Sequence, residues 1–230
     1  MQIWQLTPTT EQFGSPYIST KADAAYYVEL FGERCYQGAS IESHWQPTMV
    51  YNFIKVDIGR LAFGSQEFWM CTEQAKEVLE PLLSKSVEFL PLIHRDKTNQ
   101  KISTFKQLFF NKTYKPLLDL VHTKPHYLMH ILDIRTLDVI DAEHSEFEFN
   151  EEKQEIFLTE SLAFHPKKIE HTHIFKIIQH GRGLAMRTFV SDEFRRIIQK
   201  NKLTGLVFSA AEGDEGNLVW RDDVREVEHL

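Results

Sequence analysis

Histidine is the residue type in this sequence that could most readily perform chemistry, because eleven of the 230 residues are histidine. His171 and His173 are separated by one residue, which would place both imidazoles on one face of a strand, and His165 lies shortly before them. Imidazoles are common zinc ligands, and a bound zinc could activate water for hydrolysis. Zinc also needs further ligands, and no signature such as His-Glu-x-x-His is present. The alternative is a solvated polar turn over 170–173 that leads into a strand.

A second group of histidines recurs at every fourth residue, which is a ligand spacing on a helix: His122, His126 and His130. Pro125 argues against a helix at this point. On a strand, His126 and His130 would share a face with Leu128 and Leu132. We therefore expect hydrogen-bonded histidines of the protein core here.

The other catalytic patterns in the sequence are incomplete. The triplet 94–96 reads His-Arg-Asp like a kinase catalytic loop, but Lys101 stands where an asparagine is required. The stretch 180–183 holds a single Gly-x-Gly without the third glycine of a dinucleotide site. Cys35 and Cys71 lie far apart with no histidine near either, which indicates free thiols rather than nucleophiles or a disulfide. We expect no catalytic residue, no metal and no cofactor.

Acidic residues are concentrated between 138 and 155, where one lysine, Lys153, accompanies eight carboxylates: Asp138, Asp141, Glu143, Glu146, Glu148, Glu151, Glu152 and Glu155. The whole chain has a net charge of −7, which disfavours nucleic acid as the main partner and suits a basic protein. Such a run is a solvated face, a set of acid–base groups or a recognition surface. As partner-binding residues we predict Asp138, Asp141, Glu143, Glu146 and Glu148. Asp141 can instead cap or turn the chain.

The elements that must position these residues are clearest over 186–208. This segment predicts a strand, a helix capped by Ser191, and a second strand from Leu206. Three apolar residues recur at helical spacing on one buried face: Phe194, Ile197 and Ile198. Gly205 is expected to have a positive φ where the chain leaves the helix.

An earlier strand–helix–strand unit aligns with this one without gaps, with Thr72 opposite Ser191 and Val87 opposite Leu206. Many strand–helix–strand segments look alike, and the alternative explanation is that each lobe contains a similar unit. Pro81 is expected to kink or end the earlier helix, and Gly59 to form a turn after a strand over 48–58.

The remaining pattern consists of short strands interleaved irregularly with helices. Strands are expected over 67–71, 87–93, 156–158 and 174–178, and a long strand or strand pair over 127–140. Helices are expected over 22–30 and 105–121, and a polar loop over 95–101. The sequence therefore predicts an α+β fold of mixed, mostly antiparallel strands with packed helices. We expect two lobes, 1–115 and 116–230, or one continuous domain.

The N-terminal segment has neither the basic flank nor the apolar core of a signal peptide. No window approaches the roughly 18 apolar residues of a membrane span. Together with the unpaired cysteines, these features predict a cytoplasmic protein.

Two stretches of the sequence resemble a family of bacterial immunity proteins from polymorphic-toxin systems, including type VI secretion. The first is 38–92, with its strand end Phe-Leu-Pro-Leu at 89–92. The second is 127–208, and its motifs are Asp-Ala-Glu-His-Ser-Glu-Phe at 141–147, Ile-Phe at 174–175, Phe-Val-Ser at 189–191 and Thr-Gly-Leu at 204–206.

This resemblance implies a non-enzymatic protein that binds and neutralises a cognate antibacterial toxin, often a nuclease, with no direct contact to nucleic acid or membrane. Two alternatives stay open. One is a small metal-dependent hydrolase that uses His165, His171 and His173. The other is an adaptor of a secretion system.

Overall fold

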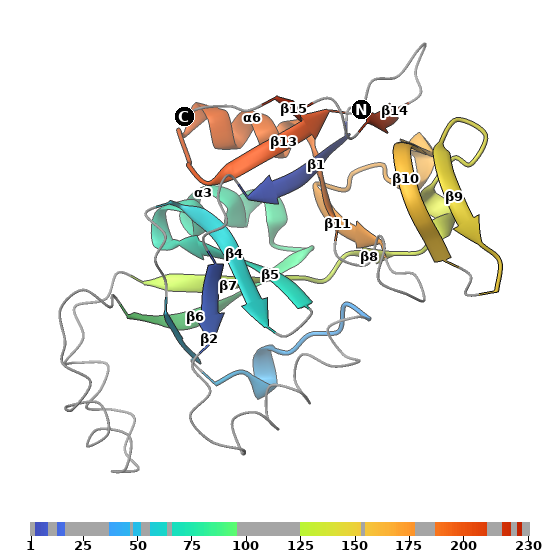
Figure 1. Ribbon diagram of the computed structural model, residues 1–230. Coiled ribbons are helices and arrows are strands. Elements are labelled where there is room, and N and C mark those ends of the chain that lie inside the picture. The colour runs from blue at the N-terminus through green and yellow to red at the C-terminus, as the bar shows by residue number, and fades with distance from the viewer. Residues whose placement is uncertain are drawn as a thin grey trace.

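The computed structural model of the chain describes residues 3–8, 13–16, 37–46, 48–51, 56–63, 66–95, 125–152, 155–177, 187–210, 218–221 and 225–226. Within these ranges two α-helices, α3 (Glu73–Leu83) and α6 (Asp192–Lys200), lie among short strands (Figure 1). Three 3₁₀ turns, η1 (Glu42–His44), η3 (Leu137–Val139) and η4 (Pro166–Lys168), connect some of the strands.

Six strands close into a barrel in the order β2 (Phe13–Pro16), β3 (Thr48–Tyr51), β6 (Val87–Arg95), β7 (His126–Ile131), β5 (Gln66–Thr72) and β4 (Ile58–Phe63). Side chains alternate between the two faces of each strand, so Phe68 and Met70 join one buried cluster while Trp69 and Cys71 join another. The first cluster also holds Leu90 and Leu128 from the neighbouring barrel strands.

The other strands form two further sheets. A six-stranded sheet has the order β15 (Arg225–Glu226), β13 (Leu206–Ala210), β1 (Ile3–Pro8), β12 (Thr188–Ser191), β11 (Ile174–Ile177) and β8 (Ile134–Arg135). A three-stranded sheet has the order β14 (Leu218–Arg221), β10 (Glu155–Phe164) and β9 (Glu146–Asn150). Most neighbouring strands are antiparallel, and the predicted α+β class is confirmed.

Both helices begin as the sequence predicts. The Thr72 hydroxyl accepts a hydrogen bond from the Ala75 amide, and the Ser191 hydroxyl accepts one from the Phe194 amide. Each bond satisfies an amide that has no partner inside the helix. Glu73, Asp192 and Glu193 add negative charge at the positive ends of the helix dipoles.

The two strand–helix–strand units are equivalent in structure as well as in sequence. The unit β5–α3–β6 receives β7 between its two strands, and the unit β12–α6–β13 receives β1 in the same place. The registers also correspond. Thr72 pairs with His126 and Leu90 with Leu128 in the barrel, and at the equivalent positions Ser191 pairs with Ile3 and Ser209 with Gln5.

The central strands are exchanged between the two halves of the chain. β1 precedes the first unit in sequence but lies inside the second, while β7 precedes the second unit but lies inside the first. Each half of the chain therefore completes a sheet of the other half. Residues 96–124, around the proposed lobe boundary, lie outside the described residues, so the division at 115/116 stays a prediction.

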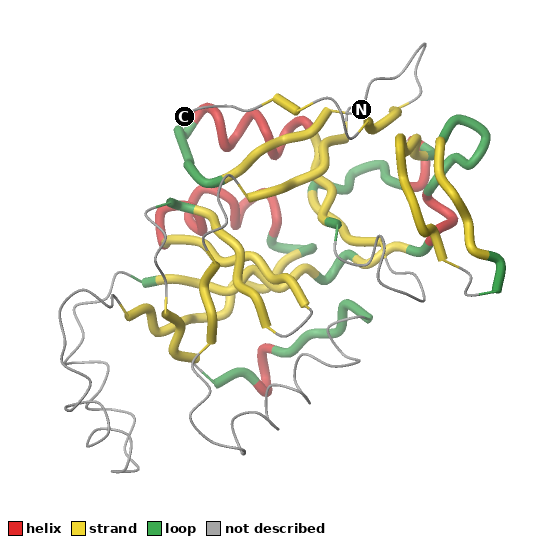
Figure 2. The backbone as a smooth tube through the Cα atoms, in the orientation of Figure 1, coloured by secondary structure: helices red, strands yellow, loops and turns green. Residues whose placement is uncertain are grey.

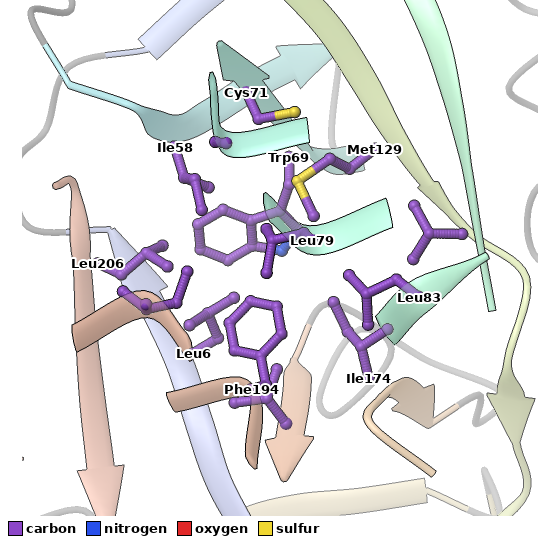
Figure 3. Packing of buried hydrophobic residues seen from close by; sticks show 14 of the residues in the cluster. Leu6, Ile58, Trp69, Cys71, Leu79, Leu83, Met129, Ile174, Phe194 and Leu206 are labelled. Atoms are coloured by element: carbon purple, nitrogen blue, oxygen red, sulfur yellow. The ribbon is translucent and has the colours of Figure 1, made fainter. Parts of the chain in front are cut away.

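One hydrophobic cluster joins the two units. Figure 3 shows Trp69 surrounded by Leu6, Ile58, Leu79 and Leu206, which come from both halves of the chain. The buried Trp69 indole donates to the Thr188 hydroxyl at 2.9 Å across 119 residues, and these two residues hold equivalent positions. The equivalent helices α3 and α6 also contact each other (Figure 2). Contacts between equivalent parts indicate an approximate two-fold relation of the two units.

Several expected elements differ from the structure. Helix α3 continues through Pro81 to Leu83, so the proline does not end it. Gly59 lies inside β4, which starts at Ile58, rather than in a turn. Of the strand expected over 48–58, β3 covers 48–51, and 52–55 lie outside the described residues. Of the long strand or strand pair expected over 127–140, the structure forms two strands, β7 and β8, and the last part is the turn η3. The helices expected over 22–30 and 105–121 and most of the loop over 95–101 lie outside the described residues.

Helix α6 ends at Lys200, and the residue with positive φ that closes its C-terminal turn is Lys202 rather than Gly205. Lys202 has a φ of +54°, and the amides of Lys202 and Leu203 donate to the carbonyls of Gln199 and Ile198. This is the hydrogen-bond pattern of a Schellman motif, in which a glycine is usual. Gly205 does have the predicted positive φ, +107°, but its role is close approach. A Cβ there would lie 2.0 Å from the Ile58 carbonyl oxygen and 2.9 Å from the Val56 side chain.

These two positions predict stability changes of opposite sign. Lys202→Gly should raise the free energy of unfolding by roughly 0.5–1 kcal/mol, because it removes the left-handed strain of a lysine. Gly205→Ala should lower it by roughly 1–3 kcal/mol or more, because strain and a backbone clash act together. Urea denaturation of both variants measures the changes. Equal effects at the two positions would contradict the different roles assigned to them.

Candidate functional site

The three histidines of the metal hypothesis do not form a common site. His171 is exposed at a φ of +61°, with 90% of its side chain accessible. His165 has its Nδ1 atom 3.8 Å from an Asp141 carboxylate oxygen. Among the described residues, no group of three histidine, cysteine or acidic side chains is placed to hold a metal ion. The geometry of this part of the chain therefore gives no support to a zinc-dependent hydrolase.

His173 supports the start of a helix and is not a solvated residue of a turn. Its Nδ1 lies 3.1 Å from the Ser191 hydroxyl, and its carbonyl accepts from the Ser191 amide. In the equivalent unit Asp57 holds the cap residue Thr72 in the same way, through its carbonyl and its carboxylate. His173 is thus the counterpart of Asp57, and the expectation of a solvated side chain is correct for His171 alone.

The pair His173 and Ser191 does not form a nucleophilic dyad. Ser191 is buried, and its hydroxyl already accepts from the Phe194 amide. Glu193 approaches the same imidazole nitrogen, Nδ1, at 3.7 Å. A catalytic triad needs the carboxylate and the serine on opposite ring nitrogens. The arrangement therefore serves the helix cap.

The histidines of β7 lie in the core, as the sequence predicts. His126 and His130 are both buried, and Nε2 of His130 lies 2.9 Å from the Ala39 carbonyl oxygen. A carbonyl only accepts, so Nε2 of His130 carries the proton. Burial lowers the pKa of His130 below its ordinary value. His122 lies outside the described residues.

The remaining candidate catalytic residues that the structure describes are a buried cysteine and two residues of a strand. Cys71 is a free, buried cysteine, and burial raises the pKa of its thiol, which disfavours the nucleophilic thiolate. His94 and Arg95 end strand β6 instead of lying in a loop. Asp96, Cys35 and the glycines near 180 lie outside the described residues.

Two of the predicted partner-binding residues, Asp138 and Asp141, make hydrogen bonds that stabilise turns of the acidic segment. The Lys168 amine donates to the Asp138 carbonyl at 2.6 Å and to its carboxylate at 3.1 Å, and the Thr136 hydroxyl also donates to that carboxylate. These bonds, first from Thr136 and then from Lys168, lower the pKa of Asp138. Its carboxylate therefore stays charged while it fixes the turn η3.

Asp141 turns the chain before strand β9. Its carboxylate accepts a hydrogen bond from the Glu143 amide at 3.2 Å and lies 2.9 Å from Nδ1 of His144. The Asp141 carbonyl accepts from the Ser145 hydroxyl at 2.6 Å. Burial raises the pKa of Asp141, but the hydrogen bond to His144 and the charge interactions with His144 and His165 more than offset this and hold the pKa below its usual value. With 14% of its side chain exposed, Asp141 is largely a turn residue.

The other three predicted residues present their carboxylates outward. Glu143 is exposed in the turn, and Glu146 and Glu148 are exposed on one face of β9. β9 lies at one side of the molecule, away from the barrel (Figure 1). Glu143, Glu146 and Glu148 are thus exposed to solvent, as is the Asp138 side chain, 60% of which is accessible, whereas Asp141 is largely covered.

Phe149 is an exposed residue of β9 that the sequence analysis missed. Its side chain is 42% exposed, more than any other large apolar side chain whose burial the structure describes. The alternation Glu-Phe-Glu-Phe over 146–149 is the signal that could have identified a strand with one acidic and one aromatic face.

Comparison with known families identifies residues 105–213 as a match to the model of the Immunity protein family (Imm11). The matched residues include the acidic segment, β9, β10 and helix α6. The resemblance to an immunity protein family is thereby confirmed. The second stretch that carries it, 127–208, lies within the match, and the whole of the first stretch, 38–92, lies before it. Among curated proteins, no relative matches the chain.

The role of His173 gives a prediction for stability. His173→Ala should lower the free energy of unfolding by roughly 0.5–1.5 kcal/mol, because the cap residue Ser191 loses a hydrogen-bond partner. The matched control His171→Asn should change it by less than about 0.5 kcal/mol, since the side chain is exposed and asparagine tolerates a positive φ. Urea denaturation measures both. Stoichiometric zinc in the purified protein, lost in either variant, would restore the metal hypothesis.

Proposed function

We propose that the chain binds and neutralises a cognate antibacterial toxin in the cytoplasm of the cell that carries it. The observation behind this proposal is the match of residues 105–213 to an immunity protein family. Within the described residues no helix is long and apolar enough to cross a membrane. The candidate catalytic groups that can be placed have roles in capping, turns and the core. We therefore propose inhibition by binding rather than by enzymatic action.

The proposed contact surface is the acidic segment. Glu143, Glu146 and Glu148 present carboxylates to solvent, while Asp138 and Asp141 hold the backbone that carries them. The net charge of −7 adds a long-range negative field. Such a field speeds the encounter with a basic partner and does so less as salt rises.

The toxin that best fits this charge is a nuclease effector of a polymorphic-toxin or type VI secretion system. A nuclease carries a basic surface where nucleic acid phosphates bind. Carboxylates that occupy this surface would mimic the phosphates and exclude the substrate. Inhibition would then follow from blocking the active site, with no chemistry by this chain.

Charge reversal on β9 tests the proposal. The wild-type chain should rescue growth when it is co-expressed with the toxin encoded beside its gene, and the two should co-purify. Glu146→Lys with Glu148→Lys should slow association roughly tenfold at low salt and flatten its salt dependence, because steering charges are inverted. Stopped-flow association at several salt concentrations measures both effects.

The matched control is Glu77→Lys with Glu170→Lys, which makes the same charge change at exposed positions outside this surface. It should associate at nearly the wild-type rate. If both double variants slow association equally, the net charge and not β9 directs binding. If the wild-type chain neither binds nor counters the toxin, the function itself is wrong.

A further inference from the structure

We propose that β9 binds the toxin by strand addition: an extended segment of the toxin pairs with the outer edge of β9 and adds a fourth strand to the β14–β10–β9 sheet. The inference rests on the proposed function and specifies its binding mode. The segment would alternate basic and apolar residues. Its basic side chains would face Glu146 and Glu148, and an apolar side chain would cover Phe149.

The position of β9 in its sheet is the first observation. Among the described residues β9 pairs with β10 alone, and it forms one end of the strand order. An edge strand presents backbone donors and acceptors along its outer side, and an added strand can use them. Main-chain hydrogen bonds of this kind supply affinity, and the side chains on each face supply specificity.

The second observation is that the core of the protein makes little use of β9. None of its five residues is buried, whereas β10 contributes Ile156, Leu162 and Phe164 to the core. Phe147 is the one residue of β9 that packs against that cluster, and it is only partly buried. The hairpin also lies between β7 and β12, a stretch in which the two equivalent halves of the chain differ. Completion of the exchanged sheets therefore does not require β9.

The third observation is the chemistry of the two faces of β9. Glu146 and Glu148 lie on one face, and Phe147 and Phe149 lie on the other, because strand side chains alternate. Phe149 leaves 42% of its side chain exposed and is paired in register with the buried Ile156. An apolar side chain from an added strand could pack beside Phe149 and extend an existing apolar row.

The glutamates of β9 determine which kind of strand can pair with its outer edge. A second copy of β9 would place glutamates next to glutamates, which is unfavourable, so the acidic face discourages self-association. A strand with lysine or arginine at alternate positions gains attraction instead. The same residues thus exclude a second copy of this chain and favour a basic toxin segment.

Hydrogen exchange tests the binding mode in the full chain. The probe is an inactive variant of the toxin domain encoded beside this gene. Backbone amides within 146–150 should exchange at least tenfold more slowly in the complex than in the free protein, because an added strand bonds the outward amides. Amides of β10, which lies inside the sheet, should change far less.

A side-chain comparison accompanies this measurement. Phe149→Lys should weaken binding at least tenfold while lowering the urea midpoint only slightly, since 42% of the side chain is already exposed. The conservative variant Phe149→Leu should bind within about threefold of the wild type, because leucine keeps an apolar contact.

The outcomes separate this inference from the proposed function. A tight wild-type complex whose β9 amides exchange as in the free protein would overturn strand addition and leave toxin binding intact. Protection of β9 that rises with concentration in the free protein would assign the edge to a second copy and overturn the inference. Absence of any complex with the wild-type chain would remove both the inference and the function.

Discussion

The exchange of two central strands is the constraint on which the rest of the structure depends. β5 and β6 are both antiparallel to β7, and β12 and β13 are both antiparallel to β1, so each central strand joins two strands that would otherwise not pair. Each central strand comes from the opposite half of the chain. The interface between the halves follows from this, including the bond between Trp69 and Thr188 and the carboxylate of Asp57, which accepts from the amide and hydroxyl of Thr204.

This interlocked frame explains how the chain can carry an edge strand, β9, that contributes little to the core. Helices, barrel and six-stranded sheet bury their side chains against one another, and β10 covers the outer face of that sheet through Phe164, which contacts Phe175 and Phe189. β9 is attached to β10 and adds acidic and aromatic side chains at the periphery. The core of the protein therefore does not determine these peripheral side chains, and the proposed function assigns them to a partner.

Local features could be read from the sequence, and long-range ones could not. The caps Thr72 and Ser191 and the α+β class follow from nearby residues, and the equivalence of the two units follows from an alignment without gaps. The exchange of β1 and β7 depends on pairing across more than half of the chain, for which periodicity carries no signal. The role of His173 was missed for the same reason, because its partner Ser191 lies 18 residues away. The position of β9 at the edge is likewise a property of the assembled sheet. The exposure of Phe149 can be interpreted only once that position is known.

The strand exchange is tested most directly by cutting the chain between its halves. A protease site inserted between residues 95 and 125 leaves β1 covalently joined to β5–α3–β6, and β7 joined to β12–α6–β13. The exchange predicts that the two fragments stay together after cleavage, elute at the volume of the uncut protein in native buffer and separate only in denaturant. Fragments that separate in native buffer as two folded species would show that each half completes its own sheet, which would contradict the exchange.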